Sequence, residues 1–148
     1  MYLTNPIGGT IENPLDKTPK AYGFASMALG PYNETGKLND DGTTSGAYSV
    51  ALCYNNKVYG FAGFAAGYEH HIYSSAGGAL GRGNSIKGIA AFAAGENNTA
   101  EGSRSIALGW LSYAKGEQSF SVGNYTKAVG NYSFAGGQGD VNDGMTGS

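Results

Sequence analysis

The stretch that decides the fold reads Ser105-Ile106-Ala107-Leu108-Gly109 and, fourteen residues later, Ser119-Phe120-Ser121-Val122-Gly123. The same pattern, with substitutions, starts without a slip at residues 49, 63, 77, 91, 105, 119 and 133. A second signature, apolar-x-Gly, begins nine residues after most starts, as in Ala114-Lys115-Gly116. A fixed internal period indicates a repeat architecture, so we number the positions of each unit 1 to 14 from these starts.

The pattern within a unit predicts short strands. Large apolar residues alternate with small ones at positions 1 to 5, and alternation with period 2 is typical of a β-strand. Glycine recurs too often for a helix, and at fixed positions it allows the positive φ that tight turns need. The sequence therefore predicts an all-β fold, a parallel β-solenoid (β-roll) of about seven to eight coils. Each coil carries two short strands and stacks about 4.8 Å above the last.

The two faces of the first strand differ in bulk. Positions 2 and 4 hold large residues such as Ile106 and Leu108, whereas positions 1, 3 and 5 hold Ser, Ala and Gly. A single thin roll encloses little interior, so we expect one of these faces to pack on neighbouring chains. The pattern is compatible with either face forming that interface.

The repeat divides the chain into three parts. Residues 1–20 contain Pro6, Pro14 and Pro19, do not follow the repeat and are predicted to form an N-terminal arm. The repeat domain spans 21–137, and the Gly-rich residues 138–148 are predicted to form a flexible tail or linker. Nine extra residues separate the unit that starts at Ser26 from the unit that starts at Ser49.

We assign these extra residues to an inserted loop at 31–43, because this segment is polar and rich in turn formers. Insertions in repeat folds commonly form loops on the binding face. The loop residues that we consider candidates for ligand contact are Tyr32, Asn33, Lys37, Asp40 and Asp41.

Composition excludes several partner classes. With a net charge of −2 and 14% charged residues, the chain is not expected to bind nucleic acid. No apolar run reaches the roughly 18 residues of a membrane helix, so we expect no membrane insertion by this chain. No export signal is visible, which predicts either a piece of a larger protein or assembly without that export route. The single cysteine, Cys53, stands in a glycine column and is expected to be small and buried.

No catalytic constellation, nucleotide loop or metal motif stands out, so we expect no enzyme, no cofactor and no metal. The His70-His71 pair falls in the column of Asn56, Asn84 and Asn98. Adjacent strand residues point to opposite faces, so the pair is expected to be exposed at a turn or edge. The alternative is a metal bridged by three copies of one histidine on a trimer axis.

The turn after the first strand is the most informative place for recognition. Its positions 6 and 7 stack along one edge and carry aromatic and charged residues, which are common at binding surfaces. They would contact a sugar or a protein partner, or instead cover neighbouring coils or a subunit interface. The candidate binding edge consists of Tyr54, Tyr68, Arg82, Trp110 and Tyr125.

Over about residues 21–137 the chain resembles the head repeats of trimeric autotransporter adhesins of the YadA type, whose unit runs Ser-Val-Ala-Ile-Gly and then Ala-x-Gly. The segments at 105–109, 114–116 and 119–123 carry this resemblance. It implies a left-handed parallel β-roll, a side-by-side homotrimer, extracellular display on a bacterial cell surface, and attachment to a host protein or glycan receptor.

We identify no heptad stalk and no barrel anchor in this sequence, so we expect the resemblance to be to a head. Similar β-rolls occur in phage fibres. The alternative function is therefore that of a virion structural protein on a phage particle, a fibre, receptor-binding or capsid-decoration protein that contacts other virion proteins through its N-terminal arm.

Overall fold

The structure is a computed structural model that describes residues 17–37 and 39–139, and every regular element in these ranges is a β-strand. The long-strand series is β2 (Met27–Leu29), β4 (Val50–Tyr54), β6 (Phe64–Tyr68), β8 (Gly78–Arg82), β10 (Phe92–Glu96), β12 (Ile106–Trp110), β14 (Phe120–Asn124) and β16 (Phe134–Gln138). The short-strand series is β1 (Lys20–Ala21), β3 (Glu34–Thr35), β5 (Lys57–Val58), β7 (His71–Ile72), β9 (Ser85–Ile86), β11 (Thr99–Ala100), β13 (Tyr113–Ala114) and β15 (Lys127–Ala128).

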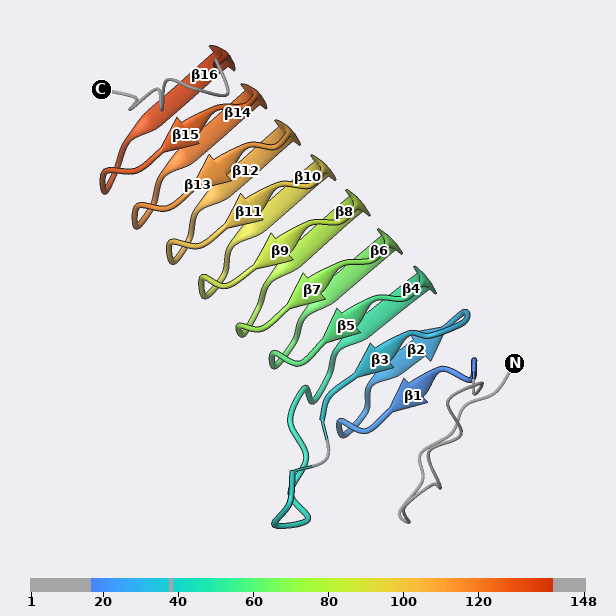
Figure 1. Ribbon diagram of the computed structural model, residues 1–148. Coiled ribbons are helices and arrows are strands. Elements are labelled where there is room, and N and C mark those ends of the chain that lie inside the picture. Colours follow the sequence, from blue (N-terminus) through green and yellow to red (C-terminus); the bar gives the residue numbers. More distant parts are fainter. Residues whose placement is uncertain (1–16, 38, 140–148) are drawn as a thin grey trace.

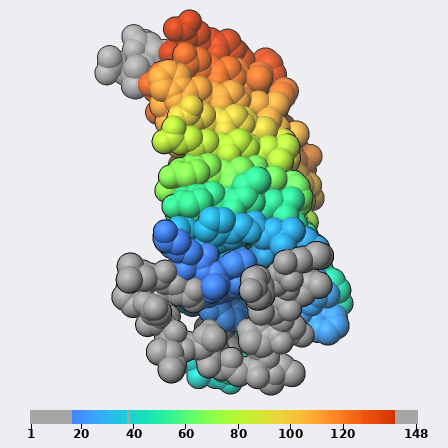
Figure 2. Space-filling view, turned by 90° about the vertical axis from the view of Figure 1, so that its right-hand side faces the viewer, coloured from blue at the N-terminus to red at the C-terminus, as the bar shows by residue number. Residues whose placement is uncertain are grey.

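The strands form two parallel eight-stranded sheets, one from each series, and each coil contributes one strand to both (Figure 1). Neighbouring strands pair in register fourteen residues apart, as Ala93 with Ala107 and Ala107 with Ser121. The coils stack as successive layers from one end of the molecule to the other (Figure 2). The prediction of an all-β parallel solenoid is therefore confirmed.

Small residues fill the interior of the roll. Position 3 of the long strands points inward, and Ala51, Ala65, Ala79, Ala93 and Ala107 are completely buried there. The facing short strands contribute position 10, for example Val58, Ile72 and Ile86. The bulky residues of positions 2 and 4 lie on the outer face of the long-strand sheet instead, because only small side chains fit between two sheets joined by such short turns.

An internal ladder of polar side chains at position 8 links the coils. The Asn84 amide donates to the carbonyl oxygens of Leu80 (2.7 Å) and Gly95 (3.0 Å). Its Oδ1 accepts the backbone N–H of Asn98 at 2.9 Å. Equivalent bonds are made by Asn56 and Asn98, so in these three coils a buried amide satisfies carbonyl oxygens that would otherwise lack a partner. In other coils the position holds His70, Ser112 or Thr126.

Position 5 requires glycine in most coils. Gly109 has a φ of 111°, and a Cβ built there would lie 2.1 Å from the carbonyl oxygen of Gly123 in the next coil. Cys53 occupies this column with a φ of 81° and is exposed. The expectation that Cys53 is buried is therefore wrong. Cys53 still pairs with Gly67 inside the sheet, but its positive φ interrupts the alternation that would point the side chain inward.

The predicted loop at 31–43 is misplaced. Strand β3 lies inside that range, and its Thr35 is completely buried and pairs with Val58. The departure from the repeat lies instead between Gly36 and Gly46, at residues 37–45. Thr35 replaces the apolar residue of the second signature, and this substitution hid the strand from pattern matching. The insertion has the expected length of nine residues but a different position.

The remaining boundaries fall mostly on residues that the structure does not describe. The proposed N-terminal arm at 1–20 is described only from residue 17, and strand β1 begins at Lys20. The proposed tail at 138–148 is described only to residue 139. Both assignments stay predictions.

Candidate binding surfaces

The five candidate edge residues lie along one side of the solenoid, where the long strands end. Tyr54 and Tyr68 stack face to face, with ring centroids 5.0 Å apart and planes inclined by 3°. The Arg82 guanidinium lies over the other face of Tyr68, at 5.6 Å from its centroid, and pairs with Glu96 at 3.6 Å. Two coils further on, Trp110 meets Tyr125 edge to face at 4.8 Å. We call this series the aromatic edge.

This geometry limits what the aromatic edge can bind. The two faces of the Tyr68 ring are covered by Tyr54 and Arg82, so it offers its ring edge and hydroxyl group and no open face for a sugar ring. The negative charge of Glu69 raises the pKa of the Tyr68 hydroxyl, which stays a neutral hydrogen-bond donor. Trp110 has 42% of its surface exposed, the largest exposure among the candidate aromatic residues. Trp110 is therefore the strongest contact candidate on this edge.

The five candidate loop residues do not form one site. Tyr32 adjoins the aromatic edge, where its ring meets Tyr54 at 5.4 Å, and Asn33 is buried in the amide ladder. Lys37, Asp40 and Asp41 lie in the insertion. There Asp41 accepts bonds from the backbone N–H (2.9 Å) and the hydroxyl (2.6 Å) of Thr43, and the hydroxyl bond is the main cause that lowers the pKa of the Asp41 carboxyl.

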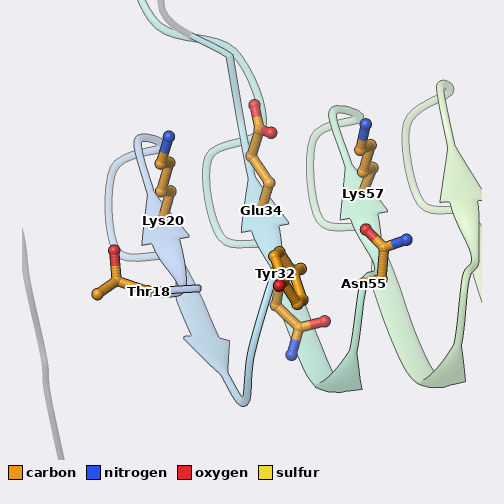
Figure 3. Close-up of a pocket in the computed structure, with 7 residues that line it drawn as sticks. Thr18, Lys20, Tyr32, Glu34, Asn55 and Lys57 are labelled. Carbon is orange, nitrogen blue, oxygen red and sulfur yellow. The ribbon is translucent and has the colours of Figure 1, made fainter. Parts of the chain in front are cut away.

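A pocket that sequence reasoning missed lies beside the start of the aromatic edge (Figure 3). It has a volume of about 180 Å³ and is lined by Thr18, Lys20, Tyr32, Asn33, Glu34, Asn55 and Lys57. The signal for it was in position 9, which holds the charged residues Lys20, Glu34 and Lys57 in three successive coils. Further along, this position holds His71, Ser85, Thr99, Tyr113 and Lys127. The misplaced loop concealed this column, since it removed Glu34 from the repeat.

Burial and charge act in opposite directions on Glu34. Its partial burial is the main influence and raises the pKa of the carboxyl, while the ammonium groups of Lys57, Lys20 and Lys37 oppose that shift. The neighbouring Tyr59 hydroxyl has its pKa raised to about 12, first by burial and then by the Glu34 charge.

A second aromatic group, also absent from the predictions, lies on the opposite turn edge. Tyr48 contacts Phe24 (5.7 Å) and Phe61 (5.4 Å) edge to face, and all three side chains are more than half exposed. These residues occupy positions 13 and 14, outside both signatures, so the repeat pattern did not draw attention to them.

The expectation that His70 and His71 are exposed is wrong for His70. The His70 ring takes the place of an asparagine in the amide ladder and is completely buried. Its Nε2 lies 3.2 Å from the Ala66 carbonyl oxygen, and its Nδ1 accepts the backbone N–H of Asn84 at 3.2 Å. Burial is the main cause that lowers the pKa of this imidazole. His71 is on the outer side of β7, so the two rings do point apart as predicted.

Among residues 17–37 and 39–139, no group of three or more His, Cys, Asp or Glu side chains is placed to hold a metal ion. No helix that could span a membrane occurs in these same ranges.

Comparison with known families agrees with the geometry. Residues 87–112 and 114–139 each match the YadA head domain repeat. Neither a search of curated proteins nor a search of solved structures gives a match. The two matched copies and the solenoid together support a repeat domain of the YadA head type in this chain. The resemblance predicted from the repeat is thereby confirmed.

Proposed function

We propose that the chain is a non-enzymatic, homotrimeric attachment module that is displayed outside the cell and binds a protein or glycan on a host surface. The repeat family and the outward apolar face of the long-strand sheet support this assignment. The family is one of adhesin head repeats, and the sheet face offers a surface on which copies can pack.

The proposed assembly rests mainly on the outer face of the long-strand sheet. Phe64 (41%), Leu80 (40%), Ile106 (39%) and Phe134 (54%) expose large apolar side chains on it. These residues come from β6, β8, β12 and β16 of the long-strand sheet and form an exposed apolar strip. Exposed apolar patches on soluble proteins mark interaction sites. Burial of this strip between three copies supplies the core that the alanine-filled interior of a single roll lacks.

The assembly has a direct test. Light scattering at micromolar concentration is expected to give three times the chain mass of 15.2 kDa. A monodisperse single-chain mass at that concentration would exclude the trimer.

Attachment through the aromatic edge is tested with Trp110→Ala. We expect the variant to lose binding in a screen of glycans and extracellular-matrix proteins, because Trp110 is the most exposed aromatic residue on that edge. Tyr132→Ala is the matched control. It removes an exposed aromatic ring on the opposite edge, in a column that already holds Ala62, Ala76 and Ala90. Equal loss in both variants, or in neither, would contradict this role of the aromatic edge.

The location of the protein distinguishes the adhesin from the virion protein. We expect antibodies against the chain to label the bacterial surface. Labelling of phage particles alone would favour the fibre or capsid-decoration alternative on the same trimeric roll.

A further inference from the structure

We propose that the pocket between the first three coils binds an acidic sugar unit, a carboxylate-bearing residue of a surface glycan. This inference rests on the proposed attachment function and assigns it a ligand class and a site. The residues that we assign to the contact are Lys20, Tyr32, Asn55 and Lys57, which all line the pocket.

The charged side chains are brought together by strand register. Lys20 pairs with Glu34, and Glu34 with Lys57, across β1, β3 and β5. Figure 3 shows the three side chains standing side by side, with Thr18, Tyr32 and Asn55 below them towards the turn. Neither lysine forms an ion pair within 4.0 Å with another residue in the ranges 17–37 and 39–139. Two ammonium groups therefore flank the pocket and can donate to an incoming carboxylate.

The remaining wall matches a polyhydroxylated ligand. The Asn55 amide both donates and accepts hydrogen bonds, and the Glu34 carboxylate accepts them from hydroxyl groups. Tyr32 adds an aromatic ring with an apolar body. The pocket volume of about 180 Å³ is below the roughly 300 Å³ at which pockets for drug-sized ligands begin, and this suits one sugar ring of a longer chain.

The fold does not need these residues. At position 9 of later coils the same structural role is filled by Ser85 and Thr99, and at position 7 Gly83 and Asn97 replace Tyr32. The charged residues at position 9 of the first three coils are thus not required by the repeat. The pocket that they line adjoins the aromatic edge, because Tyr32 contacts Tyr54 at 5.4 Å. A glycan whose acidic unit occupies the pocket can continue along that edge.

The experiment is titration calorimetry of the full chain with defined oligosaccharides. A terminal carboxylate is represented by sialyllactose, an internal one by a hyaluronan tetrasaccharide, and lactose is the neutral comparison. We expect at least one acidic probe to bind saturably, with lactose at least tenfold weaker. Binding is expected to weaken as salt is raised, since dissolved ions screen the attraction between the half-buried lysines and the carboxylate. The acidic probe that binds with the higher affinity shows whether the recognised carboxylate is terminal or internal in the glycan.

The test variant is Lys20→Gln/Lys57→Gln, which keeps the stems and removes both charges. We expect about a tenfold or greater loss of affinity, because hydrogen bonds to charged groups are worth about 1.5–3 kcal/mol, and 1.4 kcal/mol is tenfold. Lys127→Gln is the matched control, since Lys127 is at the same position of the distant strand β15. Tyr32→Asn tests the ring separately, because Asn tolerates the positive φ of 60° found there.

Two results would overturn the proposal: no binding of either acidic probe, or equal losses in the double variant and in Lys127→Gln. A whole-cell attachment assay separates this failure from failure of the proposed function. Attachment that survives in Lys20→Gln/Lys57→Gln but is lost in Trp110→Ala would keep the attachment module and remove the acidic-sugar pocket.

Discussion

At the scale of single residues, the amide ladder contains one titratable member. The His70 ring donates from Nε2 to a carbonyl oxygen and accepts at Nδ1 from the N–H of Asn84. Only the neutral ring can do both, since the charged imidazolium has a hydrogen on each nitrogen. Protonation at Nδ1 would therefore bring two hydrogen-bond donors, Nδ1–H and the Asn84 N–H, face to face in a buried site. The charged groups around this turn are Glu69, His71 and Lys57, and all of them lie nearer the surface.

This geometry predicts acid sensitivity. Because the pKa of His70 is lowered by folding, the unfolded chain binds the extra proton. The contribution of neutral His70 to the free energy of unfolding is fully present above about pH 6.5, the ordinary histidine pKa. Below that pH the free energy of unfolding falls by up to about 1.4 kcal/mol per pH unit, until the folded-state pKa of His70 is reached.

The measurement is the free energy of unfolding between pH 5 and pH 8. His70→Asn restores the ladder residue and is expected to remove most of the acid loss, whereas His71→Asn is expected to retain most of it. An unchanged pH profile in His70→Asn would contradict this role of the ring.

Cys53 shows how a residue can depart from its column without changing the fold. Its φ of 81° is a conformation that glycine adopts at no steric cost and that other residues adopt at about 1–2 kcal/mol. The same column holds Gly67 and Gly81 in the next two coils. The composition of a column predicts the backbone conformation well, but it did not predict the exposure of the side chain.

At the scale of elements, the insertion is a separate unit attached to a regular coil. Lys37 and Ser45 close its base through two hydrogen bonds of 3.0 Å, one between backbone groups and one from the Lys37 N–H to the Ser45 hydroxyl. Gly36 still donates to the Val58 carbonyl oxygen at 2.7 Å, as the regular coil requires. The insertion is therefore expected to be dispensable for folding.

Deletion of residues 37–45 tests this directly. The chain is expected to fold with a change in unfolding free energy within about 1 kcal/mol, since the stability effect of a flexible loop depends only weakly on its length. The control removes the equally long segment 31–39, which contains β3 and Asn33, and is expected to abolish cooperative unfolding of the first coils. Circular dichroism during thermal unfolding is the readout, and similar results for both deletions would refute the assigned position of the insertion.

At the scale of the whole molecule, the roll has its small side chains inside and its large ones outside. The inner columns hold mainly alanine, while Phe64 and Ile106 project from the outer face of the long-strand sheet. This is the reverse of an ordinary globular core, and it supports the proposed association of copies through the outer face.

The double variant Phe64→Lys/Ile106→Lys is expected to shift the mass in light scattering from trimer to monomer while the β signal in circular dichroism remains. Burial of two unpaired charges per chain is incompatible with a closely packed apolar interface. Thr99→Lys is the matched control, since position 9 already holds Lys57 and Lys127 on the opposite sheet. Loss of β structure together with the trimer would show instead that the roll folds only on assembly, and an unchanged mass would place the interface elsewhere.

The sequence by itself determined the period, the parallel register and the columns, including the shared column of His70 and the asparagines. It could do so because residues of the same type recur every fourteen positions, so only one register of the stacked coils places like residues side by side. Only the tertiary structure decided which strand face is interior, where the insertion leaves the coil, and that Lys20, Glu34 and Lys57 share a pocket with Tyr32. The physical reason is that alternation distinguishes two faces without choosing between them, whereas the closure of each coil by its turns sets which face is enclosed.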